Sequence, residues 1–149
     1  MDVIIEEARL SHLRDVMAAY EWLLAPPGVR PDRWDAELAA AAVRRAIESD
    51  SAAMFIAVAE QKVVGLCSAY EDIESVRFGR RVWVEDLAVH PDHRSLGIGK
   101  LLLDRAKEWA RGRGADRLVL ESSVARADAH RFYERERPDS RALSFGWWL

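Results

Sequence analysis

A glycine-rich turn between an apolar strand and an amphipathic helix is the feature that most constrains how this chain folds. The turn reads His90-Pro91-Asp92-His93-Arg94-Ser95-Leu96-Gly97-Ile98-Gly99-Lys100. Before it, residues 82–89 have the β-branched and aromatic content of a strand. After it, apolar residues recur at helical spacing, at Leu101, Leu102, Leu103, Ala106, Trp109 and Ala110. The sequence therefore predicts a strand, a tight turn and a helix in direct succession.

The turn has the chemistry of an anion site. Gly97 and Gly99 can adopt backbone angles closed to other residues, and neither places a β-carbon between the main chain and a ligand. The following helix offers unpaired amides and the positive end of its dipole. Arg94 adds a fixed positive charge that can hold a phosphate through two hydrogen bonds. Taken alone, the same turn also suits a plain connection between a strand and a helix.

Two phosphate-binding motifs are excluded by the spacing of the glycines. The chain has no Gly-x-x-x-x-Gly-Lys-Ser/Thr, and the position of a third glycine after Gly97-Ile98-Gly99 is Leu102. Arg94, Gly97 and Gly99 instead match Gln/Arg-x-x-Gly-x-Gly/Ala. The turn therefore resembles the pyrophosphate loop of the GNAT superfamily, the acyl-CoA-dependent N-acyltransferases. The preceding Glu85-Asp86-Leu87-Ala88-Val89-His90-Pro91 is similar to the strand and strand exit of that family.

The resemblance implies a binding site for acetyl-CoA as cosubstrate. The pyrophosphate would be bound by the loop, at Arg94, Ser95, Leu96, Gly97, Ile98, Gly99 and Lys100. The acyl carbonyl and pantetheine arm would bind the main chain of the strand, at Leu87, Ala88 and Val89. Arg126 stands where the family has an asparagine that contacts the arm, and an arginine there can reach a CoA phosphate instead.

Acyl transfer to an amine also requires a base and an acid. A lysine-like amine has a pKa of about 10.4, so a proton must leave before it attacks. Glu85 interrupts an apolar strand and is the first candidate base, with Asp86 as the second; a structural acid paired with Arg81 or with a backbone amide is the alternative. By resemblance, Tyr133 would protonate the departing thiolate, because Ala129-His130-Arg131-Phe132-Tyr133-Glu134 is similar to the family motif Asn-x-x-Ala-x-x-aromatic/aliphatic-Tyr. A tyrosine that only packs against the core is the alternative.

Hydrophobic periodicity and turn residues divide the chain into ten elements. The predicted strands cover residues 3–8, 53–60, 63–73, 82–89, 117–123 and 141–149, and the predicted helices cover 11–24, 32–48, 98–111 and 127–135. This order predicts an α/β fold, with residues 1–149 forming one domain. The resemblance implies a mixed central sheet of six to seven strands flanked by four helices, with the fourth and fifth strands opening into a V. The family's Leu-Gly-Phe after the tyrosine is replaced by Arg135-Glu136-Arg137-Pro138, so a short strand there is expected to be reduced or missing.

Composition limits the class of protein. The chain has 149 residues, half of them hydrophobic, and a net charge of −3, which is typical of one soluble domain and argues against general nucleic-acid binding. No apolar run approaches the roughly 20 residues that span a bilayer, and the first residues do not resemble a signal sequence. We therefore expect a cytoplasmic protein without a membrane partner. Cys67 is expected to be a buried apolar residue, and the histidines are not spaced for a metal.

These observations lead us to expect an N-acetyltransferase that moves an acetyl group from acetyl-CoA to a primary amine of a small molecule by direct attack. Two alternatives remain open: acetylation of a protein N-terminus or lysine, and a non-catalytic acyl-CoA-binding sensor or interaction module. In the family, the link at residues 24–34 borders the acceptor. The aromatic end, Phe145-Gly146-Trp147-Trp148-Leu149, suggests a homodimer, because alternation on a strand would point one tryptophan outward.

Overall fold

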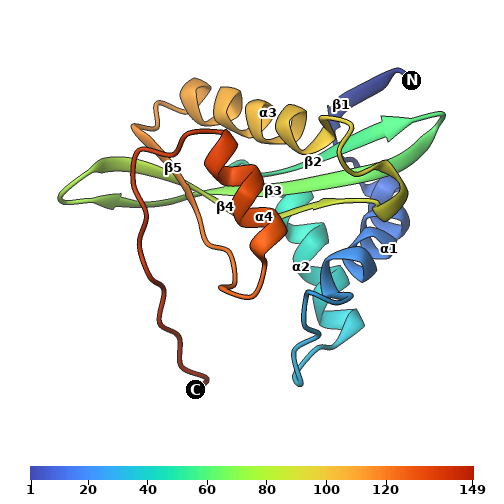
Figure 1. The fold of residues 1–149 in the computed structure, drawn as a ribbon, viewed down its shortest axis with the longest axis horizontal. Helices are drawn as coiled ribbons and strands as arrows, with labels where there is room; N and C mark the ends of the chain where they lie inside the picture. Colours follow the sequence, from blue (N-terminus) through green and yellow to red (C-terminus); the bar gives the residue numbers. More distant parts are fainter.

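A computed structural model of residues 1–149 contains one mixed sheet of five strands with helices on both faces (Figure 1). The strands are β1 (Val3–Glu7), β2 (Ala52–Ala59), β3 (Lys62–Ser75), β4 (Gly79–Val89) and β5 (Arg117–Leu120). The helices are α1 (Leu13–Leu24), α2 (Ala36–Glu48), α3 (Ile98–Gly112) and α4 (Ala127–Arg135), with short 3-10 turns at Leu10–His12 and Pro91–His93. The α/β architecture and the four helices agree with the sequence-based prediction.

The strands follow one another across the sheet in the order of the chain. The first three pairings are antiparallel, and β5 alone runs parallel to its neighbour β4 because α3 carries the chain back across the sheet. Glu60 and Gln61 join β2 to β3 with φ of +48° and +63°. Two left-handed residues give a turn whose twist matches the flanking strands, and this short hairpin pairs Ala59 with Lys62 before a bulge next to Val58 shifts the register.

Two hydrophobic layers hold the sheet between its helices. On one face, α3 buries Leu102 against Phe55 and Val84, which are at most 2% exposed. On the other face, α1 and α2 cover a second cluster that contains the fully buried Val16 and Leu66. Figure 1 shows α3 on one side of the sheet and α1 and α2 on the other. Burial on both faces explains why β2 and the first half of β3 are nearly continuous apolar runs.

The sheet opens between β4 and β5. The two strands pair only between residues 81–84 of β4 and residues 117–120 of β5. Beyond Val84, β4 continues to Val89 while β5 ends at Leu120, so this part of β4 has no strand neighbour on that side. The helix α4 lies in front of the opening (Figure 1). This is the V-shaped separation that the resemblance implies.

The predicted strand over residues 141–149 is wrong, and the sheet has five strands rather than six to seven. After α4, Arg137 adopts a left-handed φ of +55° and Pro138 lacks a main-chain donor, so the chain turns away before it can pair with β5. The following segment runs away from the sheet (Figure 1). Its large apolar side chains are exposed, namely Leu143, Phe145, Trp147, Trp148 and Leu149.

Several predicted boundaries also shift. The second helix begins at Ala36 rather than after Asp32, because Asp35 is its cap and accepts from the amides of Glu37 and Leu38 at 2.9 and 3.0 Å. The first α-helix begins at residue 13, two residues later than predicted. The third helix includes residue 112, the fourth strand begins at residue 79, and the fifth strand ends at residue 120. None of the helices is long and apolar enough to cross a membrane.

Candidate active site

The predicted anion-binding turn joins β4 to α3. Ser95 and Gly97 take left-handed φ angles of +61° and +83°, which bend the chain sharply before the helix. A β-carbon added to Gly97 would meet no atom within 4 Å, so the space in front of this residue is open. Arg94 donates from Nε to the carbonyl of Val89 at 3.3 Å, which keeps its guanidinium at the end of β4.

The N-terminus of α3 is left without a cap from the protein. Gly97 occupies the cap position, so no side chain accepts from the first amides, and no acidic residue lies in the first turn. The first amides of an α-helix have no partner within the helix, and together with the helix dipole they attract an anion. The open space, the free amides and Arg94 therefore fit a pyrophosphate group.

The predicted loop residues contribute in different ways. Ser95 and Leu96 are exposed, whereas Ile98 is 1% exposed and packs into the core. A β-carbon on Gly99 would lie 3.4 Å from the ring of Phe132, so this glycine permits the close approach of α4. Lys100 is exposed and pairs with Asp104 at 2.7 Å, one helical turn along α3. Ile98 and Gly99 therefore offer the ligand main-chain groups rather than side chains.

The strand residues predicted to bind the pantetheine arm lie on the open side of β4. Leu87, Ala88 and Val89 pair with β3 along one edge, and their other edge faces the separation between β4 and β5. Since an unpaired strand edge exposes alternating N–H and C=O groups, this part of β4 can bind an extended amide-containing chain.

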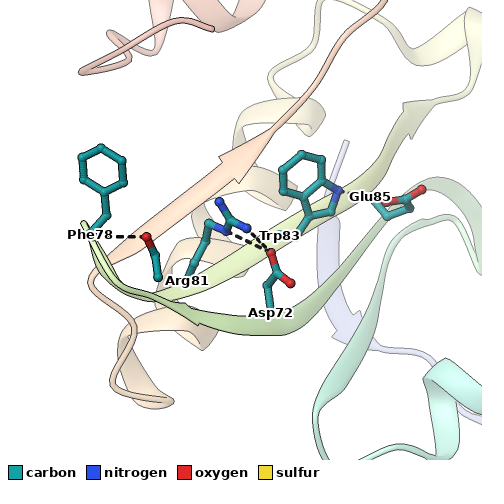
Figure 2. Close-up of polar contacts among 6 residues, drawn as sticks. Asp72, Phe78, Arg81, Trp83 and Glu85 are labelled. Atoms are coloured by element: carbon teal, nitrogen blue, oxygen red, sulfur yellow. Dashed lines mark hydrogen bonds and ion pairs between the residues drawn. The ribbon is translucent and has the colours of Figure 1, made fainter. Parts of the chain in front are cut away.

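A β-bulge separates the two candidate bases. Ser68 lies opposite Asp86 and Ala69 opposite Val84, which leaves Glu85 without a residue across from it. Glu85 is exposed and accepts from the indole Nε1 of Trp83 at 2.9 Å (Figure 2). Asp86 is half-buried instead, so two adjacent carboxylates of one strand have different surroundings.

The ion pair between Glu85 and Arg81, the alternative to a catalytic role, is not formed. Arg81 binds Asp72 through both Nε and Nη2, at 2.9 and 2.5 Å. Figure 2 shows this pair farther along the strand from the contact between Trp83 and Glu85. Glu85 is therefore free of a charged partner in the structure.

Asp86 is held by two residues that the sequence analysis did not single out. The hydroxyl of Tyr20 donates to Asp86 Oδ2 at 2.8 Å, and the amide of Asp86 donates to Ser68 Oγ at 3.1 Å. Burial raises the pKa of the Asp86 carboxyl, the negative charge of Glu85 adds to the rise, and Tyr20 and the positive charge of Arg126 oppose it. The Tyr20 phenol is also buried beside this carboxylate, and both effects raise its pKa.

Tyr20 was missed because it belongs to the apolar stripe of α1. Its partner Asp86 is 66 residues away, so no local pattern in the sequence connects them. Tyr20 also packs against Trp34, with ring centroids 6.3 Å apart. Trp34, the last residue of the link expected to border the acceptor, therefore lies beside Tyr20.

Tyr133 on α4 is mostly shielded from solvent. Burial raises the pKa of its phenol to about 12, with a smaller contribution from Cys67, and the positive charge of Arg126 opposes the rise. The phenol is therefore neutral near pH 7 and can donate a proton. Cys67 is fully buried and has no disulfide partner, in agreement with the prediction that it acts as a small apolar residue.

Arg126 points toward α1. Its Nη2 donates to the carbonyl of Leu23 at 2.6 Å, across 103 residues of sequence. A β-carbon on Gly28 would lie 2.4 Å from the same nitrogen, so the guanidinium also lies against the link after α1. Its charge acts on both Asp86 and Tyr133. Arg126 thus borders the carboxylate end of the opening, and its predicted contact with a CoA phosphate stays a prediction.

No three or more histidine, cysteine, aspartate or glutamate side chains are grouped so that they could hold a metal ion. The titratable residues of the site are instead carboxylates and phenols beside a strand edge and an uncapped helix. This arrangement suits proton transfer combined with binding of a phosphate-bearing ligand.

Comparison with protein families gives one match over most of the chain. Residues 16–137 match the model of the acetyltransferase (GNAT) family. The chain is also 32% identical over 124 residues to the uncharacterised N-acetyltransferase YhdJ of Bacillus subtilis (strain 168), covering 82% of this chain and 87% of that protein. The family match includes the strand, the turn and the tyrosine-bearing helix described above.

Two further N-acetyltransferases are similar to this chain, one in sequence and one in structure. An aminoalkylphosphonate N-acetyltransferase of Salmonella typhimurium is 36% identical over 81 residues, covering 54% of this chain and 53% of that protein. The solved structure of an aminoglycoside N-acetyltransferase in complex with CoA superposes with a TM-score of 0.85 at 18% identity, covering 99% of this chain and 95% of that chain. The structural likeness supports the fold.

Proposed function

The chain belongs to the GNAT acetyltransferase family and is an acetyl-CoA-dependent N-acetyltransferase, and from this premise we propose that its acceptor is a primary amine of a small molecule. One observation carries the proposal: the opening between β4 and β5 has an uncapped helix N-terminus at one end and the carboxylates of Glu85 and Asp86 at the other. The first end suits the phosphates of the cosubstrate, and the second suits a cationic amine. The names of the similar aminoalkylphosphonate and aminoglycoside N-acetyltransferases each specify a small amine as the acceptor.

The loop and strand are proposed to bind acetyl-CoA. Residues 94–100 receive the pyrophosphate through the free amides of α3 and through Arg94. The open edge of β4 at residues 87–89 hydrogen-bonds the pantetheine arm and polarises the acyl carbonyl. Bound acetyl-CoA supplies the thioester that the amine attacks.

Proton transfers are proposed to begin on β4 and end on α4. A β4 carboxylate, Glu85 in the sequence-based prediction, takes one proton from the ammonium group. The amine nitrogen then forms a bond to the thioester carbonyl carbon as the carbon–sulfur bond breaks. Tyr133 gives its proton to the sulfur, and the second proton lost from nitrogen restores the Tyr133 phenol through solvent. The products are the acetamide, the free CoA thiol and a protonated carboxyl.

The other two functions predict different acceptors. A protein acetyltransferase would acetylate a peptide N-terminus or lysine better than a free amine. A non-catalytic module would bind acetyl-CoA without releasing the thiol. The altered segment after Tyr133 keeps this second possibility relevant, because the structure has no strand there to cover the acceptor side.

The proposed function is tested by measuring release of the CoA thiol with an acceptor panel. The panel contains neamine, 2-aminoethylphosphonate, a peptide with N-terminal alanine and an N-blocked peptide with one lysine. We expect turnover with at least one of the free amines and little with the peptides. Preference for a peptide would support the protein acetyltransferase, and acetyl-CoA binding without turnover on any member would support the binding module.

Three further predictions belong to the same proposal. We propose that residues 1–149 form one domain, that the protein is cytoplasmic, and that it forms a homodimer through the exposed residues after α4. Trp147 and Trp148 are 81% and 73% exposed, and a second copy would remove this apolar surface from water. Sedimentation of the native protein, compared with Trp147→Ser/Trp148→Ser, tests the dimer: a native monomer would contradict it.

A further inference from the structure

The geometry points to Asp86 as the group that accepts the amine proton and to Tyr20 as the residue that positions the Asp86 carboxylate. Glu85 then attracts the ammonium group without taking its proton. This inference rests on the proposed function, since it assigns roles within the same acetyl transfer. The sequence favours Glu85 over Asp86 as the base, and the structure reverses this order.

Asp86 has one occupied and one free oxygen. Tyr20 donates to Oδ2 at 2.8 Å, and the main chain of Asp86 is fixed by its amide bond to Ser68 Oγ at 3.1 Å. No protein group donates to Oδ1, and this atom is not buried out of reach of a ligand. A carboxylate held through one oxygen presents the other in a fixed direction, which is what proton transfer to it requires.

Glu85 has the opposite properties. It is the extra residue of the bulge, its side chain is exposed, and its only protein donor is the Trp83 indole at 2.9 Å. Water solvates such a carboxylate and weakens its contribution as a base, although its charge still attracts a cation. The bulge therefore gives two adjacent carboxylates different roles: Glu85 attracts the ammonium group, and Asp86 accepts its proton.

The groups around Asp86 come from four elements. Tyr20 lies on α1, Glu85 on β4, Cys67 on β3, and Tyr133 and Arg126 on or beside α4. Burial and Glu85 raise the pKa of Asp86, whereas Tyr20 and Arg126 lower it. A raised pKa makes the Asp86 carboxylate a stronger base, and Tyr20 and Arg126 limit that rise.

The proton balance is simple. Asp86 Oδ1 takes one proton of the ammonium group and is neutral when the carbon–nitrogen bond forms. Tyr133 supplies the proton of the departing sulfur, as proposed above. The second proton lost from nitrogen restores the Tyr133 phenol through solvent, and solvent removes the proton from Asp86 after product release, so no further reactant is needed.

Three variants test the assignment with the panel amine that the native protein acetylates. For Asp86→Asn we expect kcat to fall about 100-fold or more, in the usual range for loss of a general base, with acetyl-CoA affinity unchanged. For Glu85→Gln we expect a higher KM for the amine and a kcat within about threefold of the native value. For Tyr20→Phe we expect kcat to fall about tenfold, as for loss of a hydrogen bond to a charged group.

The dependence of kcat on pH separates positioning from mere packing. Tyr20 lowers the pKa of Asp86, so its removal raises that pKa, and the acid limb of the profile moves to higher pH in Tyr20→Phe. Asp86→Glu should restore part of the activity lost in Asp86→Asn. Tyr70→Phe is the matched control, because Tyr70 lies two residues along β3 from Ser68 and is 36% exposed; its profile should equal the native one.

The assignment is overturned if folded Asp86→Asn keeps the native kcat, or if the acid limb disappears in Glu85→Gln rather than in Asp86→Asn. The role of Tyr20 is overturned if Tyr20→Phe loses activity without any movement of the acid limb. Absence of turnover by the native protein on every panel member is a different result. It removes the proposed function itself, and this inference with it.

Discussion

The two ends of the opening between β4 and β5 are built in different ways. The end proposed to bind pyrophosphate consists of main-chain amides from one continuous stretch, residues 94–100, at the start of α3. The proposed acceptor end consists of side chains that meet from distant parts of the chain: Tyr20 contacts Asp86 across 66 residues, and Arg126 contacts Leu23 across 103 residues. One end therefore depends on local backbone geometry, and the other depends on the whole fold.

This difference predicts how each end responds to mutation. Changes in the loop should impair acetyl-CoA binding whatever the acceptor is. Changes at the acceptor end should affect turnover or acceptor KM and leave acetyl-CoA binding intact.

Gly97→Trp should have the largest effect. The substitution forces a side chain onto a residue with φ of +83° and fills the open space in front of the loop amides. We expect acetyl-CoA affinity to fall at least about 1,000-fold by calorimetry, the loss of several phosphate hydrogen bonds. Gly112→Ala is the control, because a β-carbon there meets nothing within 4 Å and its φ is not left-handed. A folded Gly97→Trp protein with native affinity would mean that the phosphates bind elsewhere.

Tyr133→Phe should reduce kcat about 100-fold while acetyl-CoA affinity stays native, because only the proton donor is lost. Burial holds the pKa of Tyr133 at about 12, so this phenol remains protonated through the neutral range. The native kcat should therefore show no alkaline loss attributable to Tyr133 below about pH 10. An unchanged kcat in the variant would assign Tyr133 to packing alone.

Arg126→Met should raise the acceptor KM about tenfold, since the bond to Leu23 and one charge beside Asp86 are both lost. Acetyl-CoA affinity should change less than about twofold, because the guanidinium points toward α1. Arg131→Met is the control, because Arg131 is an exposed arginine on α4, five residues after Arg126. A tenfold loss of acetyl-CoA affinity with a native acceptor KM would instead support the phosphate contact that the resemblance implies. It would also contradict the independence of the two ends.

Lys100→Gln should have the smallest effect. The ammonium group is exposed and shared with Asp104 at 2.7 Å and Glu136 at 3.8 Å, so only part of its charge acts on the loop. We expect acetyl-CoA affinity to fall about threefold at low salt and to match the native value at high salt, where exposed charges are screened. A loss that persists at high salt would place Lys100 in direct contact with a phosphate.

The same difference explains what could be predicted from the sequence. The sequence predicts the strand–turn–helix around Gly97 and Gly99 because its motif lies in consecutive residues, and hydrophobic periodicity predicts the order of the helices and inner strands. The Tyr20–Asp86 contact had no such signal, since a tyrosine in an apolar helical stripe usually only packs. The bulge that separates Glu85 from Asp86 arises from pairing with β3, so it was also invisible in a strand considered alone.

Residues 141–149 show that composition alone does not predict a strand. Residues 141–149 contain the aromatic content of a strand, but a strand needs a neighbour to pair with and a layer to cover it. The turn at Arg137 and Pro138 directs the chain away from β5 and prevents both. The residue content of this segment is typical of a strand, but the direction of the chain after α4 leaves it no strand to pair with.

The loop and the strand edge are proposed to bind the cosubstrate independently of the acceptor end. Calorimetric titration with acetyl-CoA of the native protein and of the double variant Tyr20→Phe/Arg126→Met measures this independence directly. We predict micromolar binding by both proteins, with affinities that agree within about threefold. Absence of binding by the folded native protein, or loss of binding in the folded double variant, would contradict it.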